Sequence, residues 1–289
     1  MSEREILLRM SRRSSLQQTL DAKNAEFWNE LCGSGLGRSI GIVDHSLVSL
    51  RAFDEAYLQY YPYLLKRIPV ATMAGERVLE IGLGYGTLGQ KIVEARADYS
   101  GLDIADGPVR MMEHRLRLQQ LPGSARQGSA LHCPFPDASF DCVVSVGCFH
   151  HTGDARRAVD ETWRVLRPGG RAYVMVYNKF SLRQWLRWPL VTAIELARET
   201  GVTHRQPRVV TSDQRRAYDM SRAGQEAPET QFFSIAETRK MFNRFTSFQA
   251  HKENCDAMTV RGRRIVARNG LLSVVGPIAG LDIYLTAIK

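Results

Sequence analysis

The sequence of 289 residues is poor in cysteine and contains no long apolar run. Its five cysteines, at positions 32, 133, 142, 148 and 255, show neither metal-ligand spacing nor an even-numbered disulfide framework. No stretch of roughly 18 apolar residues occurs, and the amino-terminal residues mix glutamates with arginines without a signal-peptide core. These absences predict a cytoplasmic protein with reduced thiols, no membrane span and no metal centre.

The chain also lacks internal repeats and any recognised RNA-binding module, although its formal net charge is +9. Its 44% of hydrophobic and 24% of charged residues are ordinary for a globular protein that buries a full core. Such a charge suits nucleic acid, an anionic membrane surface or an acidic substrate. We favour a solvated surface over nucleic acid, because no aromatic residues interleave with the basic ones. The arginines gather in two clusters: Arg205, Arg208, Arg215, Arg216 and Arg222, and then Arg261, Arg263, Arg264 and Arg268.

A glycine-rich stretch, residues 77–87, organises our prediction of the fold. Val78, Leu79 and Ile81 form the short apolar run that a buried parallel strand needs. The run stops where glycines alternate at positions 82, 84 and 86, and helical spacing begins at Thr87. Because backbone amides converge where such a turn enters a helix, the stretch predicts a nucleotide-binding turn.

Two kinds of ligand are consistent with these glycines. Gly84, Gly86 and Gly89 match the spacing of a dinucleotide-binding turn, which on its own is a weak signal. Glu80 favours another ligand, since a carboxylate in an apolar strand is costly to bury without a partner and would repel a phosphate. A cationic nucleoside without phosphate would instead be attracted, and S-adenosyl-L-methionine is the commonest such cofactor.

The ends of the following strands provide further polar groups. Residues 99–104 read as a second strand ending at Asp103, where a carboxylate that binds two ribose hydroxyls is expected. Residues 127–130 end a third strand, and residues 140–147 form an apolar fourth strand followed by His150 and His151. A helix from Ala155 then leads through Arg167-Pro-Gly-Gly170 into a fifth strand, Arg171 to Tyr177.

These motifs occur in an order that resembles the class I S-adenosylmethionine-dependent methyltransferases, and among them the ubiquinone/menaquinone and natural-product enzymes. The resemblance covers roughly residues 76–178, about a third of the chain. Its pieces are residues 78–86, 101–103, 134–141, 150–151 and 164–170. It implies these cofactor-binding residues: Glu80, Gly82, Leu83, Gly84, Gly86, Asp103, Ile104, Ser129 and Ala130. Ser129 departs from relatives, which often carry aspartate there for the adenine amino group.

Either histidine after the fourth strand is a candidate general base. Methyl transfer mainly requires an aligned, dry geometry, with a base when the acceptor carries a proton. His150 and His151 lie at the carboxyl edge of the sheet, where open parallel sheets bind ligands, and imidazole titrates near neutrality. The alternative is that one gives backbone contacts to the cofactor and the other packs. No carboxylate follows the fifth strand, where Val176, Tyr177 and Asn178 stand, so support of a histidine by an acid is not expected.

The rest of the chain predicts helical and irregular segments around this core. Residues 1–75 read as a helical cap, with a short helix over residues 25–33. In relatives such leading helices often close over the cofactor, so the resemblance implies a contact from Trp28. Residues 76–180 are the cofactor-binding core and residues 234–289 complete the sheet, with a further insertion at 255–280. Residues 181–233 are a substrate lid, with one helix bent near Pro189 and then an irregular mobile loop over 202–231.

The predicted fold class is α/β, a Rossmann-like, mostly parallel seven-stranded sheet with an antiparallel last strand, helices on both faces and a helical cap. The predicted function is methyl transfer from S-adenosyl-L-methionine to an O, N or C atom of a small molecule. RNA or protein methylation through the basic surface is the first alternative, and non-catalytic cofactor binding is the second. The acceptor and the oligomeric state stay open at this stage.

Overall fold

A seven-stranded sheet forms the centre of the computed structural model, which describes residues 3–204, 206, 209–260 and 263–289. The strand order is β3-β2-β1-β4-β5-β9-β6. The bounds are β1 (Arg77–Ile81), β2 (Asp98–Asp103), β3 (Ser124–Gln127), β4 (Phe140–Val146), β5 (Leu166–Tyr177), β6 (Ser247–Glu253) and β9 (Asp282–Ile288). Strands β1 to β5 pair in parallel, and β9 runs antiparallel between β5 and β6. The predicted fold class is confirmed.

Successive strand residues face two apolar cores, one on each side of the sheet. Leu79 and Val143 point into the core beneath α7 and α11, whereas Val78 and Val144 point into the core beneath α5 and α6. Each fully buried side chain of this size contributes about 1.5–3 kcal/mol. The covering helices are α5 (Thr87–Glu94), α6 (Asp106–Leu118), α7 (Ala155–Val165) and α11 (Ile235–Met241). Apolar strands buried on both faces thus fix the carboxyl edge of the sheet as the rigid base of a site.

Strand β5 begins earlier than the sequence predicts. Leu166 already pairs with Phe140, and pairing resumes at Arg171 opposite Cys142 after a shift of register. The four residues 167–170 therefore form a bulge within the strand rather than a turn before it.

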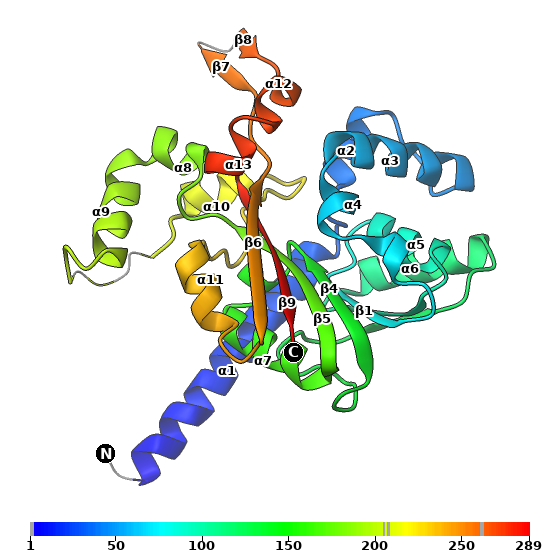
Figure 1. Cartoon of the computed structure of the whole chain (residues 1–289), viewed down its shortest axis with the longest axis horizontal. Helices are drawn as coiled ribbons and strands as arrows, with labels where there is room; N and C mark the ends of the chain where they lie inside the picture. The colour runs from blue at the N-terminus through cyan, green and yellow to red at the C-terminus, as the bar shows by residue number, and fades with distance from the viewer. Residues whose placement is uncertain (1–2, 205, 207–208, 261–262) are drawn as a thin grey trace.

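The amino-terminal residues form the predicted helical cap, but their helices differ from the prediction. The short helix over residues 25–33 is wrong, because α1 runs without a break to Trp28 and Gly33, at φ +96°, precedes the separate helix α2. Residues before Ala25 contain too few apolar positions to reveal helical spacing. Figure 1 shows α1 as a long blue rod that runs from the amino terminus into the body of the molecule. The cap consists of α1 (Glu3–Trp28), α2 (Ser34–Ser39), α3 (Leu47–Tyr60), α4 (Leu64–Arg67) and the 3-10 turn η1 (Val70–Thr72).

The segment after β5 is more ordered than predicted. Pro189 starts a second helix instead of bending the first, so α8 (Leu182–Arg187) and α9 (Pro189–Glu199) are separate. The expected irregular loop contains α10 (Ser212–Tyr218), which begins with a reciprocal capping box between Thr211 and Gln214. A helix of seven residues is too short for periodicity to reveal. The expected irregular structure is therefore wrong for residues 212–218.

The insertion before β9 carries the outermost part of the molecule, at the top of Figure 1. It holds the hairpin β7 (Met258–Val260) and β8 (Arg263–Val266), followed by α12 (Arg268–Leu272) and α13 (Gly276–Ala279). Arg268 is buried, and its guanidinium donates to the backbone oxygens of Tyr60 and Cys255 and to Asn254 Oδ1 at 2.7 Å. This arginine therefore stabilises the fold and is not part of an open basic surface.

Other members of the two basic clusters are only partly accounted for. Arg205, Arg208 and Arg261 lie outside the described residues, whereas Arg215 and Arg216 both pair with Glu226.

Within the described residues, none of the helices combines the length and the apolar character needed to cross a bilayer.

Candidate functional site

A cavity of about 1070 Å³, including its open mouth, lies at the carboxyl edge of β1, β2, β3 and β4. Among the two predicted histidines, only His151 lines it. All nine predicted cofactor residues line it: Glu80, Gly82, Leu83, Gly84, Gly86, Asp103, Ile104, Ser129 and Ala130. The structure thus brings the predicted residues to one place, while their roles stay predictions.

The turn after β1 needs glycine for both conformation and space. Gly82, Gly84 and Gly86 have φ angles of +86°, +52° and +83°, a region that other residues rarely adopt. A Cβ on Gly82 would lie 2.7 Å from Cys148 Cβ. In α5, a Cβ on Gly89 would lie 2.6 Å from Glu80 Oε2. The third glycine of the apparent dinucleotide motif therefore makes room for a buried carboxylate of the protein, which removes one reason to expect a pyrophosphate.

A buried ion pair holds the turn to the helical cap. Arg115 of α6 is fully buried and donates to both carboxylate oxygens of Asp54 in α3, each at 2.9 Å. Its Nε also donates to the carbonyl oxygen of Tyr85 at 2.8 Å, and Thr87 Oγ1 donates to Asp54 Oδ1 at 2.6 Å. The glycine turn, α3 and α6 are therefore fixed together. No local pattern predicts this role of Arg115, because its partners lie 30 and 61 residues away in the chain.

We expect Arg115→Met to lower the free energy of unfolding by about 3–5 kcal/mol, because Asp54 would remain buried without its partner. Chemical denaturation of the ligand-free protein measures this loss. The matched control is the double variant Arg115→Met with Asp54→Leu, which removes both charges and should recover most of the stability. An unchanged unfolding free energy in the single variant would contradict the importance of the pair.

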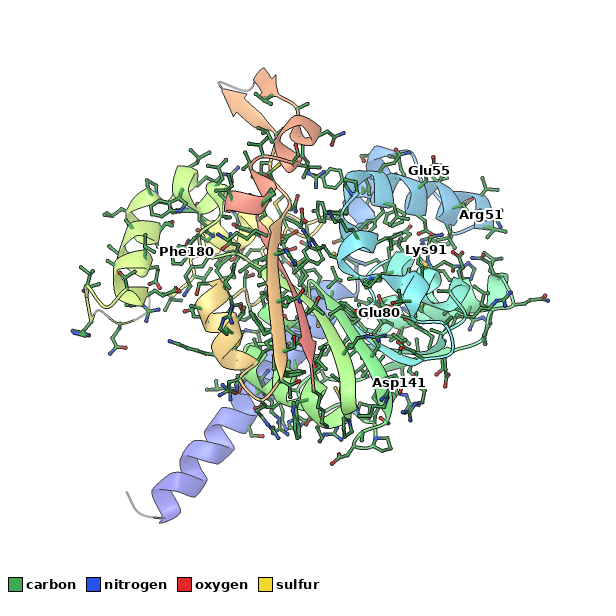
Figure 2. The ribbon with its side chains drawn as sticks, viewed as in Figure 1. Arg51, Glu55, Glu80, Lys91, Asp141 and Phe180 are labelled. Carbon is green, nitrogen blue, oxygen red and sulfur yellow. The ribbon has the colours of Figure 1, made fainter. Side chains whose placement is uncertain are left out.

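Glu80 is buried beside the glycine turn, and one of its oxygens has a partner. Tyr99 Oη donates to Glu80 Oε2 at 2.6 Å, whereas no described group donates to Oε1. Burial raises the pKa of Glu80 to about 8, against the opposing effect of the Tyr99 hydrogen bond. Figure 2 labels Glu80 among the strands, while Arg51 and Glu55 lie on the exposed side of α3. A buried acid with one free oxygen is suited to a cationic ligand.

Asp103 ends β2 and is held by the backbone. Leu83 N donates to Asp103 Oδ2 at 2.8 Å and Ala105 N donates to Oδ1 at 2.9 Å. Burial raises the pKa of Asp103 to about 6, although these backbone hydrogen bonds oppose the shift. A carboxylate oxygen can accept more than one hydrogen bond, so the oriented side chain is suited to accept from two neighbouring hydroxyls.

His151 and His150 follow β4 in the 3-10 turn η2 (Phe149–His151), and the structure separates them. His151 Nδ1 lies 2.6 Å from the carbonyl oxygen of Glu229, which fixes the proton of the neutral ring on Nδ1. Its Nε2 lies 3.4 Å from Asp219 Oδ2. Burial lowers the pKa of His151, with Asp219 opposing, and burial raises the pKa of Asp219, with His151 opposing. Nε2 therefore carries the lone pair of the neutral ring, and a proton taken up there would face the Asp219 carboxylate.

His150 is fully buried and packs rather than lining the cavity. Its ring centroid lies 3.9 Å from that of Tyr177 and 4.2 Å from that of His151. Neither ring nitrogen has a hydrogen-bond partner among the described residues, and burial lowers the pKa of His150 well below its usual value. His150 therefore packs against the ring of His151 and helps to hold it in place.

The expectation that no acid supports a histidine is wrong. Asp219 follows α10 and also accepts a hydrogen bond from Tyr177 Oη at 3.0 Å. The acid comes from the segment after β5 instead of from the strand itself, so the residue types at 176–178 could not predict it. The only local pattern near Asp219 is the Thr-x-x-Gln capping box at the start of α10. This pattern predicts a helix, but it does not predict the contact between Asp219 and His151.

Comparisons with known proteins agree with this geometry. Residues 79–174 match a family model described as a methyltransferase domain. The resemblance to class I methyltransferases is confirmed, and so is S-adenosyl-L-methionine as the cofactor that such a domain uses. Outside this domain the family model says nothing of the chain.

Individual relatives match only part of their length. The chain is 31% identical over 106 residues to a demethylmenaquinone methyltransferase of Tropheryma whipplei, covering 36% of this chain and 43% of the relative. It is 30% identical over 140 residues to a phthiotriol/phenolphthiotriol dimycocerosates methyltransferase of Mycobacterium leprae, covering 47% of this chain and 51% of the relative. The chain thus spans about half or less of the length of these relatives. Their activities therefore do not define the activity of this chain.

One solved structure extends the similarity of fold beyond the methyltransferase domain. A methyltransferase of Mesorhizobium loti that depends on S-adenosylmethionine superimposes with a TM-score of 0.51 at 15% identity. The superposition covers 79% of this chain and 97% of that protein. At this identity the similarity shows the fold alone.

Proposed function

We propose that the protein transfers a methyl group from S-adenosyl-L-methionine to an O, N or C atom of a small molecule. The observation that carries this proposal is the charge of the cavity. Glu80 and Asp103 line it beside the glycine turn, and no lysine or arginine occurs among its described lining residues. A pyrophosphate would find no cationic partner there, whereas a cationic nucleoside would find two acids.

The residues present fit this cofactor part by part. The glycine turn would hold its amino acid end, the free oxygen of Glu80 would attract its positive charge, and Asp103 would accept from its ribose hydroxyls. We propose the same nine lining residues as the binding set. When bound, the cofactor supplies a methyl group on a positively charged sulfur, which leaves with the bonding electron pair.

His151 is the proposed general base. With Nδ1–H donating to Glu229, its Nε2 can accept the proton of an acceptor group, and Asp219 stabilises the resulting imidazolium. Asp219 is a positioning residue, oriented in turn by Tyr177. Because burial lowers the pKa of His151, the ring is unprotonated near neutrality and available to take a proton.

The cavity favours a compact, partly apolar acceptor. Beyond the polar groups it is lined by Trp28, Tyr57, Leu64, Cys32 and Val146. We propose that residues 1–75 and 181–233 enclose this acceptor over the core of residues 76–180, with residues 234–289 completing the sheet. Placement in the cytoplasm stays a proposal, which the free state of all five cysteines supports.

A pH series tests the role of Glu80. A nearby cation favours the ionised acid, so the affinity for S-adenosylmethionine should rise with pH, by up to about tenfold per unit below the pKa of about 8. Titration calorimetry from pH 6 to 8 measures this. The ligand's own amino group titrates at about 7.7–8.0 and acts in the opposite direction, and Glu80→Gln shows that effect alone. A rise of the same size in Glu80→Gln would refute the assignment.

Transfer of a labelled methyl group tests the function itself. The protein and labelled S-adenosylmethionine are added to a small-molecule extract, to total RNA and to protein from the source cells. We expect label in the small-molecule fraction only. Label in RNA or protein would favour the alternative based on the basic surface, and cofactor binding without any transfer would favour a non-catalytic binding protein.

A further inference from the structure

The far end of the cavity has room for the base of the nucleoside. Along the sheet, His151 follows β4, the glycine turn follows β1 and Asp103 ends β2. A ligand that presents its methyl group toward His151 and its ribose to Asp103 continues toward the end of β3. There Ile104, Pro108 and Ala130 line the cavity and offer apolar faces to a flat ring.

A carboxylate reaches this end of the cavity from the amino-terminal helix. Asp21 of α1 lines the cavity, and its Oδ2 accepts from Ser129 Oγ at 3.2 Å. Its Oδ1 accepts from Gln17 Nε2 at 2.7 Å. Ser129 is 108 residues away in sequence, so the contact is a product of the tertiary fold. Two donors orient the carboxylate, and each oxygen keeps a lone pair for a ligand.

Helix α1 is fixed to the core where it carries Asp21. Asn24 Nδ2 donates to the carbonyl oxygen of His151 at 2.8 Å, and Gln17 Nε2 donates to that of Thr152 at 2.8 Å. Leu20 packs against Gly153, where a Cβ would lie 2.5 Å from Leu20 Cδ2. Side chains on three successive turns of the helix therefore hold it against the loop after β4, and the position of Asp21 is defined.

We propose that Asp21 accepts a hydrogen bond from the 6-amino group of the cofactor's adenine, with Ser129 as its positioning residue. This inference rests on the proposed function. The base of an S-adenosyl compound carries a single exocyclic amino group, a donor that a carboxylate is suited to accept. The acid that recognises the base thus comes from the cap, while the strand end contributes only the serine that orients it.

Binding measurements with a pair of ligands test this role. The ligands are S-adenosylhomocysteine and its analogue with purine in place of adenine, which lacks only the 6-amino group. The native protein should bind the adenine compound about 10–100-fold more tightly, as expected for a hydrogen bond to a charged acceptor. In Asp21→Ala this ratio should fall to about 2 or less, because only the adenine compound loses affinity.

Two further variants separate recognition from simple loss of the helix. Leu20→Ala weakens the attachment of α1 at Gly153 without removing a partner of Asp21, and should lower both affinities equally, leaving their ratio as in the native protein. Glu26→Gln, an exposed acid on the same helix, should change neither affinity.

The outcomes distinguish this inference from the function on which it rests. If Asp21→Ala lowers both affinities by the same factor, Asp21 serves only to hold α1, and the inference fails while the proposed function stands. If the native protein binds neither compound, the proposed function fails and the inference fails with it.

Discussion

Replacing His151 with asparagine is expected to lower kcat by about 10²–10⁴-fold, the usual contribution of a positioned general base. The affinity for S-adenosylmethionine should change by less than about threefold, since the proposed role of the ring concerns the acceptor. Asparagine keeps a similar size at a buried position, so the fold should be retained. Turnover of the methyl acceptor found by labelling, with titration calorimetry for the cofactor, measures the two effects separately.

His150→Leu is the matched control for this prediction. His150 is the neighbouring histidine and makes no hydrogen bond through its ring among the described residues, so an apolar side chain can replace its packing. We expect kcat to fall by less than about tenfold. The kcat of Asp219→Asn should lie between the kcat values of the two histidine variants. The acid limb of its kcat–pH profile should also shift to lower pH, because Asp219 raises the pKa of His151. Equal losses in the two histidine variants, or equal losses of turnover and cofactor affinity, would contradict the assignment of the base.

Replacing Asp103 with alanine is expected to weaken cofactor binding by at least about 100-fold. The side chain is proposed to accept two hydrogen bonds from the ribose, and hydrogen bonds to a charged group contribute about 1.5–3 kcal/mol each. Truncation also leaves the N–H groups of Leu83 and Ala105 without their present acceptor and so loosens the glycine turn. Calorimetric titration with S-adenosylhomocysteine measures the loss.

Asp106→Asn controls for the change of charge near this site. Asp106 begins α6 three residues later, has a half-exposed side chain and pairs with Arg110. Its substitution should leave the affinity within about twofold of the native value. Thermal unfolding of both variants without ligand shows whether each is folded. An unchanged affinity in a folded Asp103→Ala protein would remove Asp103 from the ribose site.

The core of the fold could be predicted from the sequence because its signals are local. The apolar run 78–81, the alternating glycines and the acid at the next strand end each lie within a few residues. Open parallel sheets then bring such strand ends to one edge. The same rule predicts that Glu80, Asp103 and the two histidines after β4 lie at one edge of the sheet, and of these Glu80, Asp103 and His151 line the cavity.

The residues of the site that the sequence did not predict have one property in common. Their contacts are made only by packing between segments that are far apart in the chain. Asp219 meets His151 across 68 positions of the chain, Arg115 meets Asp54 across 61, and Asp21 meets Ser129 across 108. Each lies on a helix or at a helix end with an ordinary polar pattern. A charged residue on such a helix looks like part of a solvated surface until the fold shows what it contacts.

Binding of the two candidate classes of nucleotide cofactor tests the central claim most directly. The claim is that two buried acids at the tips of β1 and β2 select a cationic nucleoside without phosphate. Titration calorimetry of the native protein with S-adenosylmethionine and, separately, with NAD⁺ decides between them. The account predicts saturable binding of one S-adenosylmethionine per chain and no heat of binding for NAD⁺. Binding of NAD⁺ in the absence of any S-adenosylmethionine binding would contradict it.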